Sequence, residues 1–242
     1  MQGTSTLRAA AALAAAATLA GCGLGTRFSP SFRRGMPLAL VTVTAAPKIR
    51  YTEKHVRTGF GGAPDITGSG FEAGDARPVL ASAKAAVVRA LARGGPFRLV
   101  PEQTVLSSPA YASAPAQPRN AWTSDLIVAR GYKYTYDGAQ AARIARGVGA
   151  AGALMVNLEL QYTTQGVPGG RIAGKVVVVV TAVDRSGQTV WTDWTGELSQ
   201  RTLDSTTLRV PTAALEPLLA DSAERGTSAL IAHLDERLRG MR

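Results

Sequence analysis

Two spacings of hydrophobic residues recur along the chain, and each predicts one kind of secondary structure. Apolar residues at every second position, or in short continuous runs, are typical of buried strands. This pattern predicts strands at residues 38–43, 97–100, 153–163, 171–183 and 188–199. Trp191 and Trp194 are three positions apart on the last of these strands, so their side chains should point to opposite faces of the sheet.

Apolar residues at three- and four-residue spacing predict three helices, each with one stripe facing the core. They are expected between Asp75 and Gly94, between Asp137 and Gly149, and over roughly residues 212–239. An aspartate at the start and a glycine just past the end are favourable capping residues. Pro217 predicts a break or a fresh start near the beginning of the last helix.

The predicted elements follow the order strand, helix, strand, helix, three strands, helix. This order indicates a single α+β domain over residues 37–242, with a mixed, largely antiparallel sheet and helices packed on one face. Two segments are expected to be loops, because one is rich in glycine and the other in serine, alanine and proline. They are residues 58–75 and 107–125.

The first 22 residues have the pattern of an export signal. Arg8 precedes the apolar run Ala9–Ala20, which is too short to cross a bilayer. The run ends in Leu-Ala-Gly-Cys at 19–22, and Cys22 is the only cysteine. The segment resembles a bacterial lipobox. The alternative is an alanine-rich helix of a globular domain that happens to end in cysteine.

The lipobox resemblance implies that residues 1–21 form a signal peptide and that Cys22 carries the lipid, palmitate included. Several acyl chains, at about 0.8 kcal/mol per buried CH₂, hold a protein firmly on a membrane. Gly23 after the cysteine implies the periplasmic face of the outer membrane. Residues 22–36 show no periodicity and are expected to form a tether to the domain.

Composition narrows the possible partners. The chain has 242 residues, of which 45% are apolar and 18% charged, so wholesale disorder is excluded. With 27 Lys and Arg against 17 Asp and Glu, it favours anionic surfaces such as lipid headgroups, acidic cell-wall polymers or acidic proteins. The alternative is a solvated surface with scattered arginines. Nucleic acid is not an expected partner for an exported protein.

Catalytic chemistry is not indicated. The only histidines are His55 and His233, and no G-x-S-x-G elbow is present. Glu159, Asp193 and Glu197 fall on strand positions expected to face water, where cross-strand charge pairs explain them. We therefore expect no enzyme activity, no cofactor and no metal. An envelope hydrolase acting through paired carboxylates is the lowest-ranked alternative.

An aromatic cluster is the strongest candidate for protein contact. Aromatic residues are enriched at contact surfaces, and this cluster lies in and after the proline-rich connection. The predicted contact residues are Tyr111, Trp122, Tyr132, Lys133, Tyr134 and Tyr136. The alternative is that the alternating tyrosines form an edge strand that packs on the body of the domain.

Three stretches together resemble one group of bacterial lipoproteins. They are LARGGPFRLVPEQTVLSSPAY at 91–111, RGYKYTYDGAQAARIARGVGAAGALMVNLELQY at 130–162, and GKVVVVVTAVDRSGQTVWTD at 174–193. The pattern is similar to lipoproteins that share the fold of CsgG, LpoB and the N-terminal domain of TolB. This resemblance implies a non-enzymatic adaptor that binds an envelope protein or itself. The alternative it implies is an oligomeric secretion pore of the CsgG type.

Overall fold

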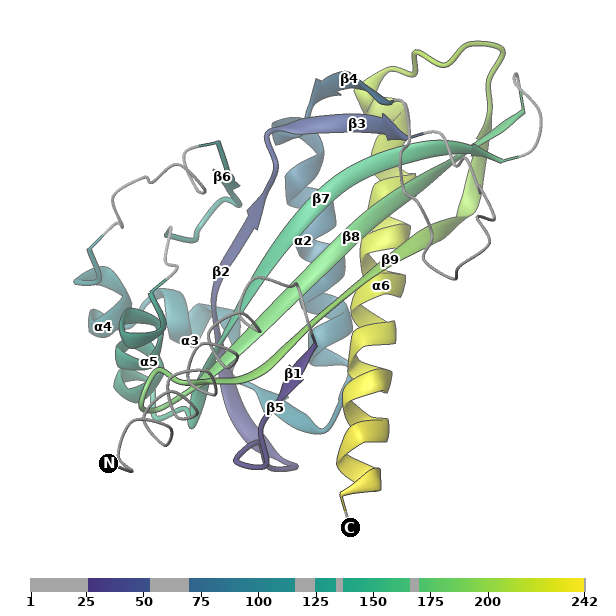
Figure 1. The fold of residues 1–242 in the computed structure, drawn as a ribbon. Helices are drawn as coiled ribbons and strands as arrows, with labels where there is room; N and C mark the ends of the chain where they lie inside the picture. Colours follow the sequence, from purple (N-terminus) through teal and green to yellow (C-terminus); the bar gives the residue numbers. More distant parts are fainter. Residues whose placement is uncertain (1–25, 53–69, 116–124, 134–136, 166–169, 242) are drawn as a thin grey trace, which may run out of the picture.

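A curved sheet with two long helices along one side forms the centre of the computed structural model, which describes residues 26–52, 70–115, 125–133, 137–165 and 170–241 (Figure 1). The main sheet has the strand order β1-β9-β8-β7-β2-β5. Its strands are β1 (Arg27–Phe28), β2 (Met36–Ala45), β5 (Phe97–Leu99), β7 (Gly152–Gln165), β8 (Arg171–Asp184) and β9 (Thr189–Asp204). β3 (Lys48–Thr52) pairs with β7 and with β4 (Gly70–Asp75), and β6 (Ile127–Val128) pairs with β2.

The three long strands β7, β8 and β9 are antiparallel neighbours, whereas β2 runs parallel to β7. Val178 on β8 lies opposite Leu158 on β7, and both side chains are fully buried. Side chains alternate between the faces of a strand, so every second residue of β7 and β8 joins the same apolar layer. The predicted α+β class, with a mixed and largely antiparallel sheet, is confirmed.

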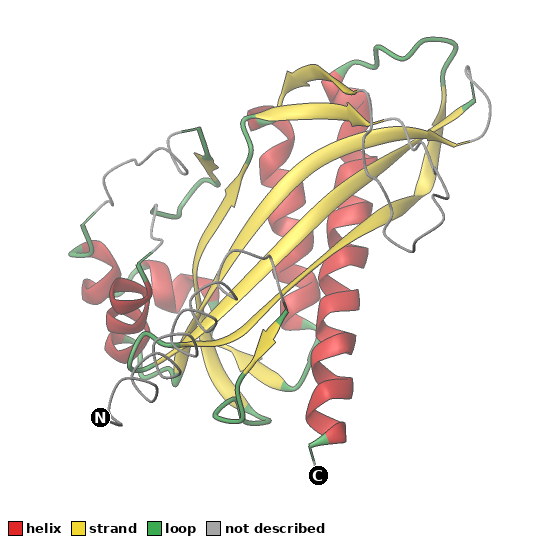
Figure 2. Cartoon of the chain, in the orientation of Figure 1, coloured by secondary structure: helices red, strands yellow, loops and turns green. Residues whose placement is uncertain are grey.

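Helices lie on both faces of the sheet, but the two long ones share a face (Figure 2). The helices are α2 (Arg77–Ala92), α3 (Glu102–Leu106), α4 (Pro109–Ala112), α5 (Gly138–Gly147) and α6 (Thr212–Gly240). Gly226 of α6 contacts Val178, on the face predicted to be dry. Gly138 of α5 instead contacts Val183, which lies opposite Ala153 on the other face. None of the described helices is long and apolar enough to cross a membrane.

Local sequence signals explain where α2 and α5 begin. The Asp75 carboxylate accepts a hydrogen bond from the backbone N–H of Arg77 at 2.9 Å. Asp137 accepts one from the N–H of Ala139 at 2.7 Å and is the N-cap residue of α5. Such bonds satisfy N–H groups that have no partner within the helix. The predicted starts of both helices are thus confirmed to within two residues.

α6 is seated on the sheet by direct hydrogen bonds as well as by apolar packing. Val176 and Glu197 face each other across β8 and β9. The buried Ser222 hydroxyl accepts from the Val176 N–H and donates to the Glu197 carbonyl, both at 2.6 Å. Arg225 donates to the Leu198 carbonyl at 3.0 Å. The helix therefore completes the pairing between two strands.

Glycine at position 174 lets α6 approach this closely. A Cβ atom at Gly174 would lie 2.7 Å from the backbone carbonyl of Leu218, nearer than real Cβ contacts allow. The β8–β9 register shifts between Ala173 and Lys175, and the Ser199 hydroxyl accepts the Gly174 N–H at 2.9 Å. A bulge commonly strengthens local twist, and here it coincides with the place where the helix rests.

The folded region starts before residue 37, which corrects the predicted tether over 22–36. β1 pairs with β9, and Phe32 is buried against Trp191 with ring centroids 6.2 Å apart. Arg34 binds Asp235 of α6 at 2.6 Å. The tether prediction treated residues 27–36 as free because they lack periodicity. Residues such as Phe32 and Arg34 are held by partners that are distant in sequence, so they produce no hydrophobic periodicity.

Three further local predictions are corrected. Residues 70–75, predicted to be loop, form β4, because they find pairing partners in β3. Part of the predicted connection 107–125 is helical, as α4 begins at Pro109 after the Ser108 N-cap. Pro217 lies inside α6 without a break, since the backbone N–H it lacks would have bonded only within the first turns.

We expect Ser222→Ala to lower the free energy of unfolding by about 1–3 kcal/mol, because it leaves a buried N–H and a buried carbonyl without their partner. Ser228→Ala is the matched control, since its exposed hydroxyl bonds only to Glu224 of its own helix. Urea unfolding measures both variants. Equal stabilities would show that Ser222 does not hold α6 to the sheet.

Gly174→Ala should destabilise the protein by at least about 1–3 kcal/mol through overpacking. Gly196→Ala on the neighbouring strand should have much less effect, because its nearest neighbour would be a Val177 methyl group at 3.4 Å. Thermal unfolding followed by circular dichroism compares the pair. A Gly174→Ala protein as stable as Gly196→Ala would contradict the close approach of α6.

Candidate functional site

The predicted contact residues fall into two groups in the structure. Cys22, Trp122, Tyr134 and Tyr136 lie outside the described residues. Tyr111, Tyr132 and Lys133 are described and do lie together, although the two tyrosine side chains are 3% and 8% exposed. Burial of this degree withdraws both rings from the surface.

Tyr111 ties α4 to the sheet and to the segment before α5. Its hydroxyl donates to the Val41 carbonyl at 3.2 Å and accepts the backbone N–H of Lys133. The Lys133 ammonium group donates to the carbonyls of Ala112 at 2.6 Å and Ala114 at 3.1 Å. These bonds hold three segments that are distant in sequence, which is a structural role.

The ring of Tyr132 lies against a half-buried ion pair. The Lys84 ammonium group stands 5.0 Å from the ring centroid and pairs with Glu102. Burial, and next the negative charge of Glu102, raise the pKa of Tyr132. Burial also raises the pKa of Tyr111, to about 12. Both phenols are therefore held in the neutral form.

The predicted contact surface is corrected for Tyr111 and Tyr132. The alternative interpretation, packing on the body of the domain, describes them better. They pack in a helix and a turn rather than in an edge strand. The reason is that tyrosine is amphipathic, so a sequence pattern alone does not distinguish a buried ring from an exposed contact residue.

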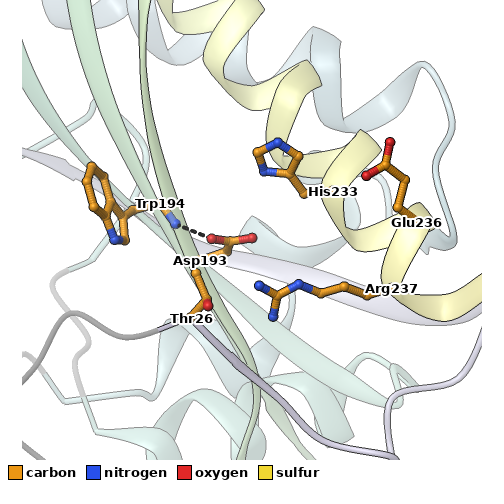
Figure 3. Close-up of a pocket in the computed structure, with 6 residues that line it drawn as sticks. All are labelled: Thr26, Asp193, Trp194, His233, Glu236 and Arg237. Carbon is orange, nitrogen blue, oxygen red and sulfur yellow. Dashed lines mark hydrogen bonds between the residues drawn. The ribbon is translucent and has the colours of Figure 1, made fainter. Parts of the chain in front are cut away.

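A different site lies where the end of α6 crosses β9 (Figure 3). A groove with a volume of about 440 Å³ opens there. Asp193 and Trp194 come from β9, and Thr26 directly precedes β1. The residues that line it are Thr26, Asp193, Trp194, His233, Glu236 and Arg237. Four of these six carry ionisable groups, which distinguishes the groove from the apolar core beside it.

Asp193 is the unusual member of this site. Its side chain is 2% exposed, and Oδ1 accepts the backbone N–H of Trp194 at 2.9 Å. Oδ2 is buried and has no hydrogen-bond partner. The prediction that Asp193 faces water on an exposed strand face is therefore wrong. It shares a face with buried Trp191, two residues earlier, because strand side chains alternate.

The opposite side of the groove is supplied by the last turns of α6. His233 and Arg237 are four residues apart, so they lie on one side of the helix. The Arg237 side chain extends toward the Asp193 carboxylate, and the His233 ring lies farther along the same side of the groove (Figure 3). No ion pair joins Asp193 to Arg237 in the described part of the chain. The groove thus holds opposite charges that do not neutralise each other directly.

Sequence reasoning missed this groove because it treated His233 and Asp193 separately. The i, i+2 relation between Trp191 and Asp193 was the available signal, since it places a carboxylate on the buried face. The partner residues on α6 could not be identified in the same way. They meet Asp193 only through the crossing of α6 over β9, which no local pattern encodes.

No protein-family model and no curated protein sequence matches the chain. Solved structures similar to it include the LpoB C-terminal domain from Salmonella enterica, at 15% identity, covering 69% of this chain and 86% of that one, with a TM-score of 0.33. Protein XCC0632 from Xanthomonas campestris, described under DUF330, has 13% identity, coverages of 91% and 97%, and a TM-score of 0.40.

A third similar structure is the hypothetical protein CT253 from Chlamydia trachomatis, at 11% identity, with coverages of 85% and 96% and a TM-score of 0.35. The LpoB part of the predicted resemblance thus has a counterpart among remote structural neighbours.

Tyr111→Phe should lower the free energy of unfolding by about 1–3 kcal/mol, since it removes the partner of the buried Val41 carbonyl and of the Lys133 N–H. Wild-type stability should also fall as pH rises from about 10 to about 12. The unfolded phenol ionises near pH 10, while the folded one keeps its proton until about 12. Urea unfolding across this range should show a shallower fall for Tyr111→Phe, and an unchanged slope would contradict this role.

Proposed function

We propose that the protein is an exported, non-enzymatic lipoprotein, anchored by Cys22 on the periplasmic face of the outer membrane. The observation that carries the proposal is the apolar run of residues 9–20, which ends at the only cysteine of the chain. Its length suits an export signal. An acylated Cys22 then supplies a lasting membrane attachment.

The start of the fold supports this arrangement. Thr26 is already at the groove, and β1 follows at Arg27. The domain therefore begins within a few residues of Cys22 and would stay close to the membrane. The short connection between Cys22 and Thr26 is consistent with a lipid anchor, because a lipid on Cys22 would hold the domain directly at the bilayer surface.

A binding role is supported by the groove between β9 and α6. It combines a buried carboxylate with a guanidinium group across an open space, which is recognition chemistry. In the described residues, no three histidine, cysteine or carboxylate side chains gather to hold a metal ion. We propose that the protein acts as an adaptor that also contacts an envelope protein or a second copy of itself. Crosslinking in membranes followed by mass spectrometry tests the protein contact.

Cys22→Ser should move the full-length protein from the membrane fraction to the soluble fraction, because the acyl chains have no attachment point. Only the wild type should incorporate labelled palmitate. Ser31→Cys in the Cys22→Ser background is the matched control, because it restores a thiol without the lipobox. Membrane sedimentation of Cys22→Ser, or an unlabelled wild type, would refute the anchor.

A further inference from the structure

One carboxylate oxygen in the groove between β9 and α6 has no hydrogen-bond partner. A carboxylate oxygen that is buried without a hydrogen bond loses its hydration and gains nothing in return. Asp193 Oδ2 is in this position, while Oδ1 is fixed by the backbone N–H of Trp194. The fixed oxygen orients the carboxylate, and Oδ2 lies just beneath the groove surface, buried and without a hydrogen-bond partner. A cationic donor placed there would satisfy it.

The far side of the groove offers the opposite chemistry. Arg237 presents a guanidinium group and His233 an imidazole (Figure 3). A guanidinium group is well suited to bind phosphate through paired N–H donors. Glu236 at the rim is exposed and adds a second carboxylate. A ligand that fits must therefore carry a cation at one end and an anion at the other.

The location of the groove points to the source of such a ligand. The chain from Cys22 to Thr26 can span at most about 14 Å, at roughly 3.5 Å per residue. Thr26 lines the groove, so the groove lies within that distance of the lipidated residue. The headgroup layer adds several ångströms on each side of the hydrocarbon core. This step rests on the proposed lipid anchor.

We propose that the groove binds the headgroup of a zwitterionic phospholipid of the phosphoethanolamine class. The ammonium group donates to Asp193 Oδ2, and the phosphate accepts from Arg237 and His233. The anchored domain would thereby rest on the membrane with the groove side of β1, β9 and the end of α6 toward the lipid. The ammonium group of the ligand is the distinguishing feature, because a basic protein that only prefers anionic surfaces would not require it.

The first experiment measures headgroup binding by the full-length, lipidated protein in detergent micelles. Glycerophosphoethanolamine, which carries both charges, should bind more tightly than glycerophosphoglycerol, which lacks the ammonium group, and than ethanolamine, which lacks the phosphate. Titration followed by nuclear magnetic resonance gives all three affinities. Equal affinity for the two phosphate ligands would overturn the proposal.

Variants identify the two ends of the site. Asp193→Asn keeps the oxygen that accepts from Trp194 but loses the charge, so it should weaken glycerophosphoethanolamine binding about tenfold or more and leave glycerophosphoglycerol unchanged. Arg237→Gln should weaken both phosphate ligands. Arg209→Gln, an exposed arginine that does not line the groove, is the control. If Asp193→Asn binds like the control, the site is refuted.

A second experiment tests the bilayer as the source. The lipidated protein is released from nanodiscs that contain equal amounts of phosphatidylethanolamine and phosphatidylglycerol, and native mass spectrometry identifies the retained lipid. We expect a phosphatidylethanolamine adduct that Asp193→Asn loses. Binding of the free headgroup without a retained lipid would refute the lipid as ligand and favour a soluble amine phosphate or a peptide.

Failure of the anchor and failure of the groove give different results. Headgroup binding in micelles does not need an acyl chain on Cys22, so the Cys22→Ser protein should bind glycerophosphoethanolamine like the wild type. A soluble wild type that binds the headgroup would refute the anchor alone. A membrane-bound wild type without headgroup preference would refute the groove alone.

Discussion

The position of α6 on the sheet depends on one contact with β8 and β9, where a serine hydroxyl replaces a direct bond between two strands. Ser222 reaches Val176 and Glu197 only because Gly174 has no side chain between the sheet and the helix backbone. Apolar packing alone would let a long amphipathic helix slide along the sheet, since the hydrophobic effect is not directional. Hydrogen bonds to strand backbone fix both its rotation and its position along the axis. The last turns of α6 are then held over β9, which creates the groove.

In the groove, the fold places the Asp193 carboxylate in a buried position that is energetically unfavourable for an acidic side chain. A buried carboxylate with one free oxygen is costly, and proteins keep such groups where they have a role or a partner. Asp193 is kept in place by its neighbours in the strand, by the nearby Trp191 in the core and by α6 above it. Thr26, the residue before β1, lines the same groove, which therefore lies close to the start of the fold.

The aromatic residues around Tyr111 show the opposite outcome, in which residues typical of contact surfaces serve the interior. A tyrosine buries a large apolar ring and still needs a partner for its hydroxyl. Val41 and Lys133 supply that partner for Tyr111, and the phenol becomes a junction between β2, α4 and the segment before α5. The surface that remains for protein contact must involve other residues.

Hydrophobic spacing determined most of the secondary structure, because burying one face of a strand or helix imposes a period on the sequence. All five predicted strands and all three predicted helices are present, as are the opposite directions of Trp191, which is buried, and Trp194, which is 44% exposed. The short elements β1, β3, β4 and β6 were missed, since a strand of two to six residues exists through its partner rather than through its own pattern. The proposed export signal, which ends at Cys22, rests on local sequence order alone. The groove was decided only by the tertiary structure, because Asp193 and Arg237 are 44 positions apart and meet through the way α6 crosses β9, a contact set by packing between elements and not by any segment in isolation.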